Sequence, residues 1–419
     1  MKFRRSAGAV ALTAATTLLT VLGGSAPATA ATLSTSPSAA LPAGLYGTGD
    51  PTYDGVWRQS LALLAQRTVG VWPARASVDW LAGQQCADGS FAAFRADPAK
   101  ACDAKTMVDT NSTGAAVQAL AEIGGHEARV RKSVAWLKSV QNADGGWGYS
   151  PGGATDANST SVVIGALAQA GETVPNVRKD GRSPFDALTK LALPCTGEDA
   201  GAFAYQPDRK GALTANADAT AAAVLGMNGE TPAVTRQDDA DSAPACAKVP
   251  ADEPEQAGEN GAVWLARALA EDGHLTSALP GAGEQPDYGN TADAVVALSA
   301  VGLNDQATAP LRWLEAHSAD WAAQAGPAAY AQLIFAAHAA RDGDVHDFGG
   351  RDLVALLNAT GPAPESVDDV ETAGPSAAAE DKDKDEGSLS TVWTVGAGLL
   401  VGAVAGFVLI GRGRKRRQP

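Results

Sequence analysis

Two kinds of helical pattern alternate along the middle of this chain. In one kind, alanine and other apolar residues occupy every side of the predicted helix; in the other, apolar and charged residues fall on opposite faces. A helix that is apolar all round must be buried, whereas an amphipathic helix can cover it from outside. The apolar helices are predicted near residues 54–67, 113–123, 160–170, 220–227, 291–301 and 327–341, and the amphipathic helices near 75–84, 129–140, 184–192, 259–271, 307–317 and 350–358.

Six helices of each kind in strict alternation predict an all-α fold. The architecture that satisfies this pattern is an α6/α6 toroid, in which six inner helices form a ring and each is backed by an outer helix. No strand pattern of comparable strength interrupts the alternation. The long segment at 228–259 is expected to form a flap, because connections of that length in compact domains are usually functional or disordered.

Four of the apolar helices begin at similar polar clusters. The clusters read DTNST at 109–113, DANST at 156–160, NADAT at 216–220 and DYGNT at 287–291, and the apolar runs that follow them are closed by Gly124, Gly171, Gly229 and Gly302. A polar cap, an apolar run and a terminal glycine together are the signature of a short helix. Their recurrence indicates a repeat protein, whose units bury a continuous core by stacking.

In a ring of helices, these polar clusters would meet at one mouth. Two interpretations stay open for their side chains: they only satisfy the free N–H groups at the helix starts, or they also form a polarised pocket for an amide-rich or hydroxyl-rich ligand. The candidate polar residues are Asp109, Asn111, Asp156, Asn158, Asn216, Asp218, Asp287 and Asn290. The aromatic residues in nearby loops that could line the mouth are Trp147, Tyr149, Tyr205 and Tyr288.

The turns between helices carry a motif that resembles the prenyltransferase and squalene-cyclase repeat superfamily. QNADGGWGY at 141–149 is similar to its QxxDGxW element, and QQCADGSF at 84–91 is a second, weaker match. The resemblance covers roughly residues 54–359 and implies a terpenoid cyclase-like α/α toroid. For Gln141 and Trp147 it implies a structural role, in which the glutamine caps a helix and the ring packs over the turn.

The same resemblance argues against the chemistry of the catalytic relatives. Triterpene cyclases carry D-x-D-D-T at the corresponding helix start, and its middle carboxylic acid protonates an alkene. Here that position holds Asn111, Asn158, Asp218 and Gly289 in turn. An amide cannot donate such a proton, so only Asp218 retains the acid. Protein prenyltransferases hold zinc there with an Asp, a Cys and a His, but Asn111 and Asn158 stand at the Cys position. We therefore predict no catalytic residue, no metal site and no cofactor.

The resemblance that remains is to the secreted, non-catalytic helical domain of transcobalamin and intrinsic factor. Those carriers clamp a corrinoid with a second, β-rich domain, which has no counterpart in this sequence after residue 360. The expected function is a membrane-anchored extracellular module that binds a small molecule or a glycan and captures it for uptake through a transporter, with a corrinoid-like ligand as a guess. The alternative is an exported enzyme, terpenoid cyclase-like or hydrolytic, that uses Asp218 or other rim carboxylates.

Both ends of the sequence carry membrane signals. Lys2, Arg4 and Arg5 precede an apolar stretch, and residues 28–30 offer the small-residue site at which a signal peptide is cleaved. Residues 392–410 are apolar and uncharged and precede five cations, which is typical of a single membrane-spanning helix with a cytoplasmic tail. The expected segments are a signal peptide (1–30), a linker (31–53), the toroid (54–359), a disordered acidic stalk rich in Pro and Ala (360–390), a transmembrane helix (391–411) and a basic cytoplasmic tail (412–419). The protein is thus expected in the cell membrane with its N-terminal domain outside.

The net charge of the part expected outside the cell limits the kinds of partner that it can bind. Of the 32 Lys and Arg residues, three lie in the expected signal peptide and five in the tail, which leaves 24 against 47 Asp and Glu. An acidic exported surface repels nucleic acid and anionic lipid, so no nucleic-acid partner is expected.

Four cysteines lie in the part of the chain expected outside the cell. In an oxidising compartment, two disulfides are a better expectation than a metal site. Four cysteines allow three pairings. The pairing that keeps both crosslinks local joins Cys86 to Cys102 and Cys195 to Cys246.

Overall fold

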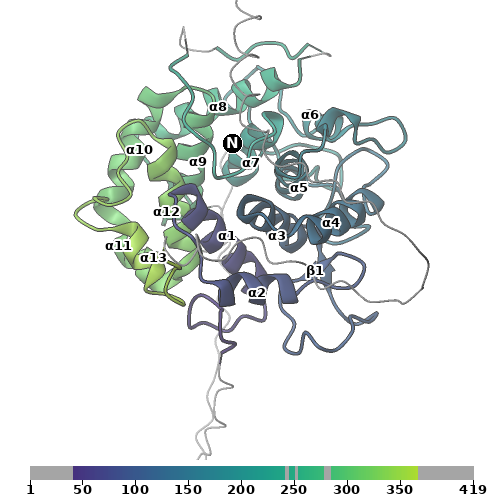
Figure 1. Cartoon of the computed structure of the whole chain (residues 1–419). Coiled ribbons are helices and arrows are strands. Elements are labelled where there is room, and N and C mark those ends of the chain that lie inside the picture. Colours follow the sequence, from purple (N-terminus) through teal and green to yellow (C-terminus); the bar gives the residue numbers. More distant parts are fainter. Residues whose placement is uncertain (1–40, 241–244, 251–252, 278–284, 367–419) are drawn as a thin grey trace, which may run out of the picture. The chain divides into compact units, whose positions relative to one another are not determined.

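The computed structural model describes residues 41–240, 245–250, 253–277 and 285–366 (Figure 1). Helices dominate this part of the chain, which confirms the predicted all-α fold. Six of the helices are buried on nearly every side and correspond to the apolar patterns. They are α1 (Gly55–Thr68), α3 (Thr110–Ile123), α5 (Ala157–Gln169), α7 (Ala217–Met227), α9 (Tyr288–Ala300) and α12 (Pro327–Ala339).

These inner helices follow one another around a closed ring. Helix α1 packs against α3, α3 against α5, α5 against α7, α7 against α9 and α9 against α12, and α12 returns to α1 (Figure 1). Small residues permit the close approach of neighbours. A Cβ on Gly114 of α3 would lie 2.8 Å from Cγ1 of Val162 on α5, so a larger residue there would push the two helices apart.

The amphipathic patterns form the outer layer. Helix α2 (Arg75–Gly83) packs on α1, α4 (Glu127–Ser139) on α3, α6 (Pro184–Thr189) on α5, α8 (Glu255–Leu269) on α7, α10 (Asn304–His317) on α9 and α13 (Leu353–Asn358) on α12. One further helix, α11 (Ala319–Ala325), was not predicted. It is a short alanine-rich segment that Gly326, at a φ of 81°, separates from α12.

Four two-residue strands form two antiparallel pairs. They are β1 (Phe91–Ala92) with β2 (Val108–Asp109), and β3 (Leu275–Thr276) with β4 (Pro286–Asp287). Within the described ranges, one 3-10 turn, η1, occupies Val174–Asn176. Each strand pair joins the turn after an outer helix to the start of the next inner helix. The strands therefore connect the two helices of a repeat and do not form a separate layer.

The threonine that ends each polar cluster also joins the two halves of a repeat. Its side-chain oxygen accepts a hydrogen bond from the backbone N–H of the apolar residue in the preceding turn, and all four threonines are buried. The pairs are Phe91 with Thr113 at 3.0 Å, Trp147 with Thr160 at 3.1 Å, Phe203 with Thr220 at 2.9 Å and Leu275 with Thr291 at 3.0 Å. A buried N–H left unpaired costs about 1–3 kcal/mol. Threonine recurs at this position because its side-chain oxygen pairs with that N–H in each repeat.

The chain closes the ring by pairing residues near its two described ends. The Tyr46 side chain is fully buried, and its hydroxyl donates to the carbonyl oxygen of Pro362 at 3.1 Å. The backbone N–H of Gly47 donates to the carbonyl of Thr360 at 2.8 Å. The packed region therefore extends beyond the expected 54–359 limits on both sides.

Several expected segments fall outside the described residues. They are the signal peptide at 1–30, most of the stalk, the transmembrane helix at 391–411 and the basic tail. Across residues 41–366, excluding the short gaps, no helix is long and apolar enough to cross a bilayer. The signal peptide and the membrane anchor stay predictions.

Both predicted disulfides are present. Cys86 and Cys102 crosslink the segment between α2 and β2. Cys195, which follows α6, is bonded to Cys246 and so fastens the long connection between α7 and α8 to the turn after α6.

We expect the two crosslinks to differ in their contribution to stability. Loss of the Cys195–Cys246 bond by a double change to serine should lower the free energy of unfolding by about 4 kcal/mol, and loss of Cys86–Cys102 by about 3 kcal/mol, because the longer closed loop restricts the unfolded chain more. The sequence separations are 51 and 16 residues. Urea denaturation of both double variants measures the difference, and a larger loss for the shorter loop would contradict this explanation.

Candidate functional site

The first polar residue of each cluster is a helix cap. The Asp109 carboxylate accepts from the backbone N–H of Ser112 at 2.6 Å, and the Asp156 carboxylate from that of Ser159 at 2.7 Å. In the same way, Asn216 caps α7 through Ala219 at 2.8 Å and Asp287 caps α9 through Asn290 at 3.1 Å. These four side chains satisfy free N–H groups at helix starts, as one of the two interpretations expected. None of the four is among the described residues that line the central cavity of the ring.

The residues just after the caps line a cavity of about 330 Å³ at the centre of the ring. Asn111, Asn158 and Asp218 each lie two positions after their cap, and Asn290 lies three positions after Asp287. All six inner helices contribute to the wall. The predicted site residues therefore divide into two groups: caps that hold the helices and side chains that face a common space.

Each inner helix presents one stripe of side chains to this ring cavity. On α3 the stripe is Asn111, Ala115 and Gln118, with the spacing of four and three residues that places side chains on one face of a helix. The complete set of polar residues in the wall is Asn111, Gln118, Asn158, Ser161, Asp218, Glu230, Asn290, Asp293 and Gln332. Trp57, Leu61, Val162, Leu225 and Phe335 supply most of its apolar surface.

Asp293 is a wall residue that the sequence did not single out. It lies on α9, three residues after Asn290, so the two side chains share a face of that helix. Gln332 on α12 donates from Nε2 to both carboxylate oxygens of Asp293, at 3.2 and 3.0 Å. Burial, with the nearby Asp218 charge adding to it, raises the pKa of Asp293 from 3.8 to about 7.

Asp218 lies on the neighbouring helix α7 under similar conditions. The Asn158 amide donates to its Oδ2 at 2.6 Å, which links the adjacent helices α5 and α7. Burial raises the pKa of Asp218, and the Asp287 and Asp156 charges act in the same direction. Burial alone raises the pKa of Glu230 as well. Among the described residues that form the wall there is no Lys, Arg or His beside these acids.

Three buried polar atoms in the wall have no hydrogen-bond partner in the part of the chain that is described. They are Oδ1 of Asn111, Oδ1 of Asn158 and Oγ of Ser161, whose side chain is only 5% exposed. Leaving such groups unpaired is costly, and native structures usually satisfy them with protein, water or ligand. A cavity that keeps unpaired acceptors is suited to a ligand that supplies donors.

None of the predicted aromatic residues is among those that line the ring cavity. Trp147 is fully buried in the turn after α4, where its Nε1–H donates to the carbonyl of Leu137 at 2.8 Å. It packs as the resemblance implied, and Gln141 braces the same turn by donating to the carbonyl of Gly145 at 2.7 Å. No face of Trp147 is left for a ligand, which corrects its candidacy as a binding residue.

The three tyrosines occupy outer positions. Tyr149 and Tyr205 are 49% and 43% exposed, and Tyr205 hydrogen-bonds to the Asp156 carboxylate. Tyr288 stacks between Trp313 and Trp321, with ring centroids 5.1 and 5.5 Å away. The aromatic side chains that do line the cavity, Trp57 and Phe335, come from the interiors of α1 and α12.

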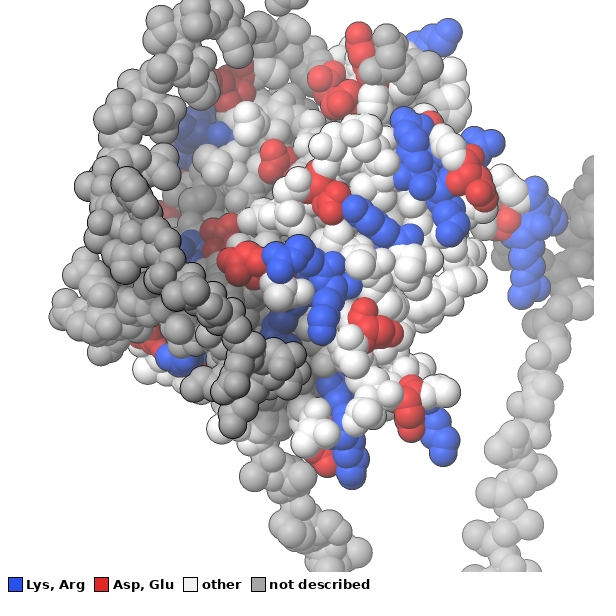
Figure 2. All heavy atoms as spheres, turned by 45° about the vertical axis from the view of Figure 1, so that its right-hand side comes forward, with Lys and Arg blue, Asp and Glu red and all other residues white. Residues whose placement is uncertain are grey.

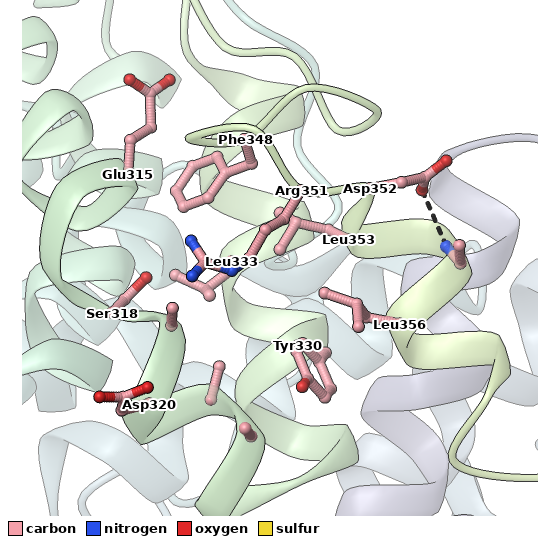
Figure 3. Close-up of a pocket in the computed structure, with 14 residues that line it drawn as sticks. Glu315, Ser318, Asp320, Tyr330, Leu333, Phe348, Arg351, Asp352, Leu353 and Leu356 are labelled. Carbon is pink, nitrogen blue, oxygen red and sulfur yellow. Dashed lines mark hydrogen bonds between the residues drawn. The ribbon is translucent and has the colours of Figure 1, made fainter.

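A second pocket, of about 430 Å³, opens on the outer side of α12 (Figure 3). Tyr330, Leu333, Phe348 and Leu356 give it an apolar wall, and the Arg351 side chain extends across it. The Asp352 carboxylate at the edge of this pocket is already engaged in a hydrogen bond: it accepts from the backbone N–H of Ala355 at 2.8 Å and so caps α13. The unpaired buried acceptors of the ring cavity have no counterpart among the residues that line this pocket.

The outer surface differs from the ring cavity in charge. Figure 2 shows Lys and Arg side chains interspersed with Asp and Glu over the face that forms the right-hand side of Figure 1. Mixed charges favour solubility and leave no field of a single sign on this face. The concentration of acids without cations among the cavity residues has no equivalent on this face.

One segment of the chain is similar to a known protein family. Residues 105–177 match the family model of the squalene-hopene cyclase C-terminal domain. Among curated proteins, none matches this chain. A protein from Actinoplanes, known from its crystal structure, is similar with 20% sequence identity and a TM-score of 0.46, over 71% of this chain and 80% of that one.

The matched segment contains α3, α4 and α5, and thus the tryptophan turn and the cavity residues Asn111 and Asn158. The resemblance to transcobalamin and intrinsic factor stays a prediction. Over residues 105–177 this chain is similar to the squalene-hopene cyclase C-terminal domain, which supports the resemblance to terpenoid cyclase-like proteins for that segment.

Proposed function

We propose that this chain is a membrane-anchored extracellular module that binds a small polar ligand in the ring cavity and does not transform it. The observation that supports this proposal most is the set of buried acceptors without partners, on Asn111, Asn158 and Ser161, in a wall built by all six inner helices. Acceptors arranged on a rigid ring are preorganised for a ligand, which reduces the entropy that binding costs.

The position of the two asparagines supports a binding role over catalysis. Asn111 and Asn158 stand where the triterpene cyclases, by the resemblance above, have the acid that protonates the substrate. An amide can hold a ligand by hydrogen bonds but cannot supply that proton. A cavity of about 330 Å³ is near the lower end of the range for small-molecule sites, so it favours a ligand much smaller than a corrinoid.

The location of the module is part of the proposal. The apolar stretch at 392–410 and the basic residues after it are typical of a membrane anchor, and the N-terminal sequence is typical of export. A ligand bound at the cell surface can be passed to a transporter, so capture for uptake is the role that fits an anchored binding module best.

Thermal stabilisation of the full-length chain in detergent tests this function. We expect at least one ligand in a panel of small sugars, amines, isoprenoid alcohols and corrinoids to raise the melting temperature, because a ligand that binds only the folded state stabilises it. Asn111→Ala and Asn158→Ala should each abolish the shift, whereas Asn176→Ala, at an exposed site outside the ring, should retain it. Absence of a shift with every ligand, or equal shifts in all variants, would overturn the proposal.

An exported enzyme remains a second candidate because of Asp293. A carboxylic acid with a pKa of about 7 beside another carboxyl group is the arrangement that general acid catalysis uses near neutral pH. Mass spectrometry of a stabilising ligand after incubation with the protein separates the two functions. We expect the ligand to be recovered unchanged; turnover that Asp293→Asn abolishes would favour the enzyme.

A further inference from the structure

We propose that the ring cavity selects a small organic cation, such as a mono- or diamine, whose ammonium group is held by Asp218 and Asp293. This inference rests on the binding function proposed above and narrows it to one chemical class. Three carboxyl groups line the cavity, on Asp218, Asp293 and Glu230, and they come from α7, α9 and the segment after α7.

The partners of these carboxyl groups are neutral. Asn158 donates to Asp218 at 2.6 Å, and Gln332 donates to Asp293 at 3.2 and 3.0 Å. Such amide contacts orient the carboxylates but leave their charge uncompensated. A buried charge without a counterion is costly, so it is neutralised by a proton or by a cation. Because none of the described residues that line the wall is Lys, Arg or His, a bound ligand can supply that cation.

The inventory of donors and acceptors in the wall favours the same class. Four of the five wall amides already donate to protein: Gln118 to the carbonyl of Val162 at 3.0 Å and Asn290 to Asp287 at 2.7 Å, in addition to Asn158 and Gln332. The buried wall atoms without a partner in the described part of the chain are mainly acceptors: they are Oδ1 of Asn111, Oδ1 of Asn158 and the Ser161 hydroxyl, which can also donate. An ammonium group carries three donors and no acceptor, so it matches these acceptors and the carboxylates, whereas each hydroxyl of a polyol also brings an acceptor, for which this wall offers few donors.

The rest of the wall suits the carbon part of such a ligand. Trp57, Leu61 and Phe335 provide apolar contact for methylene groups, and an indole ring attracts a cation over its face. Among the described residues, no group of three or more His, Cys, Asp or Glu side chains is arranged to hold a metal ion. Asp218 lies in the first turn of α7 and Glu230 follows the end of that helix, so a ligand with a second nitrogen atom fits these two separated carboxyl groups.

Binding of a cation should depend on pH because Asp293 must be ionised to hold it. The groups that face Asp293 are Asp218 from α7, Asp287 at the start of its own helix and the neutral Gln332 from α12. Both charged neighbours are acids, so they favour protonation of Asp293 when the cavity is empty, and its pKa is about 7. A bound ammonium group would stabilise the ionised form and release the proton.

Calorimetry with two matched probes tests the class of ligand. The full-length chain in detergent is titrated with 1,4-diaminobutane and with 1,4-butanediol, which have the same carbon chain, near pH 6 and near pH 8. We expect the diamine to bind and the diol to bind at least about ten-fold more weakly. The diamine affinity should rise by up to about ten-fold between the two pH values, because the ionised fraction of a group with a pKa near 7 rises by about that factor.

Variants assign the effect to the cavity. Asp293→Asn should weaken diamine binding and remove its pH dependence, whereas Asp272→Asn, at an exposed turn outside the ring, should change neither. Thermal melting of each variant verifies that it is folded. Asp218→Asn provides a second disruption of the same site if Asp293→Asn is poorly folded.

The outcomes separate this inference from the binding function. If a sugar or another neutral ligand stabilises the chain in an Asn111-dependent manner and the diamine does not bind, the cation class is wrong and the binding function stands. Equal affinity for diol and diamine, or diamine binding that survives both cavity substitutions, also contradicts the cation class. If no probe of any class binds, both proposals fail.

Discussion

Replacing Trp147 with alanine should lower the free energy of unfolding by about 3–5 kcal/mol, the range measured when large buried aromatic residues are truncated. The ring is fully buried, and its Nε1–H is paired with the carbonyl of Leu137 at 2.8 Å. Its backbone N–H is also held by Thr160, so the turn after α4 is connected to the start of α5. Urea denaturation of the full-length chain measures the loss.

Two further variants test why Trp147 stabilises the fold. One separates its apolar ring from its hydrogen bond, and the other is a control at an exposed aromatic residue. Trp147→Phe keeps most of the apolar ring but leaves the Leu137 carbonyl unpaired, so it should cost about 1–3 kcal/mol. Tyr149→Ala changes an aromatic residue two positions away that is 49% exposed, and it should cost less than about 1 kcal/mol. If Trp147→Ala were as mild as Tyr149→Ala, the tryptophan would not be a core residue and its candidacy for ligand binding would return.

The helices of this fold could be predicted because each one is marked locally. A residue such as Asp109 or Asp156 caps the first turn, an apolar run follows, and Gly124 or Gly171 at positive φ ends it. Alternation of buried and amphipathic runs then indicates the two layers. The lengths of the outer helices were less predictable: α6 and α13 begin at the caps Ser183 and Asp352, but both are shorter than the amphipathic patterns indicated.

The site was predicted only in part because caps and wall residues are neighbours in the sequence. Asp109 and Asn111 are both polar and two positions apart, yet one side chain turns back to the helix N–H groups and the other faces the cavity. Sequence spacing places both at the same mouth but does not separate their roles. The recurrent threonine was visible as a pattern, whereas its bond to the preceding turn required the tertiary structure.

Asp293 and Gln332 escaped prediction for a different reason. Each is a single polar residue within an alanine-rich run. Asp293 lies outside the polar cluster at 287–291, and Gln332 belongs to a helix that has no such cluster. The role of a lone polar residue in a buried helix can be assigned only when its hydrogen-bond partner is known. Here the partner lies on another helix of the ring. The helical spacing of three between Asn290 and Asp293 was the one local signal available.

Asp293→Asn should stabilise the empty protein at neutral and alkaline pH. Burial and the Asp218 charge raise the pKa of Asp293 from 3.8 to about 7, so the folded chain keeps a proton that the unfolded chain releases. The contribution of this group to stability is therefore fully present below about pH 4, declines as the pH rises toward 7 and is lost above it. Asparagine removes the penalty of the buried charge and can still accept the Gln332 hydrogen bond.

The expected gain for Asp293→Asn is about 2 kcal/mol near pH 8 and close to zero near pH 4, less than the full 1.36 kcal/mol per pKa unit because the side chain faces a cavity that can admit water. Urea denaturation at several pH values measures the difference between variant and wild type, and Asp272→Asn is the control that should follow the wild type throughout. Parallel curves for Asp293→Asn and the wild type would mean that Asp293 titrates as an ordinary carboxyl group. The charge that the proposed cation neutralises would then carry no penalty in the empty cavity, and the reason for a pH-dependent affinity would be lost.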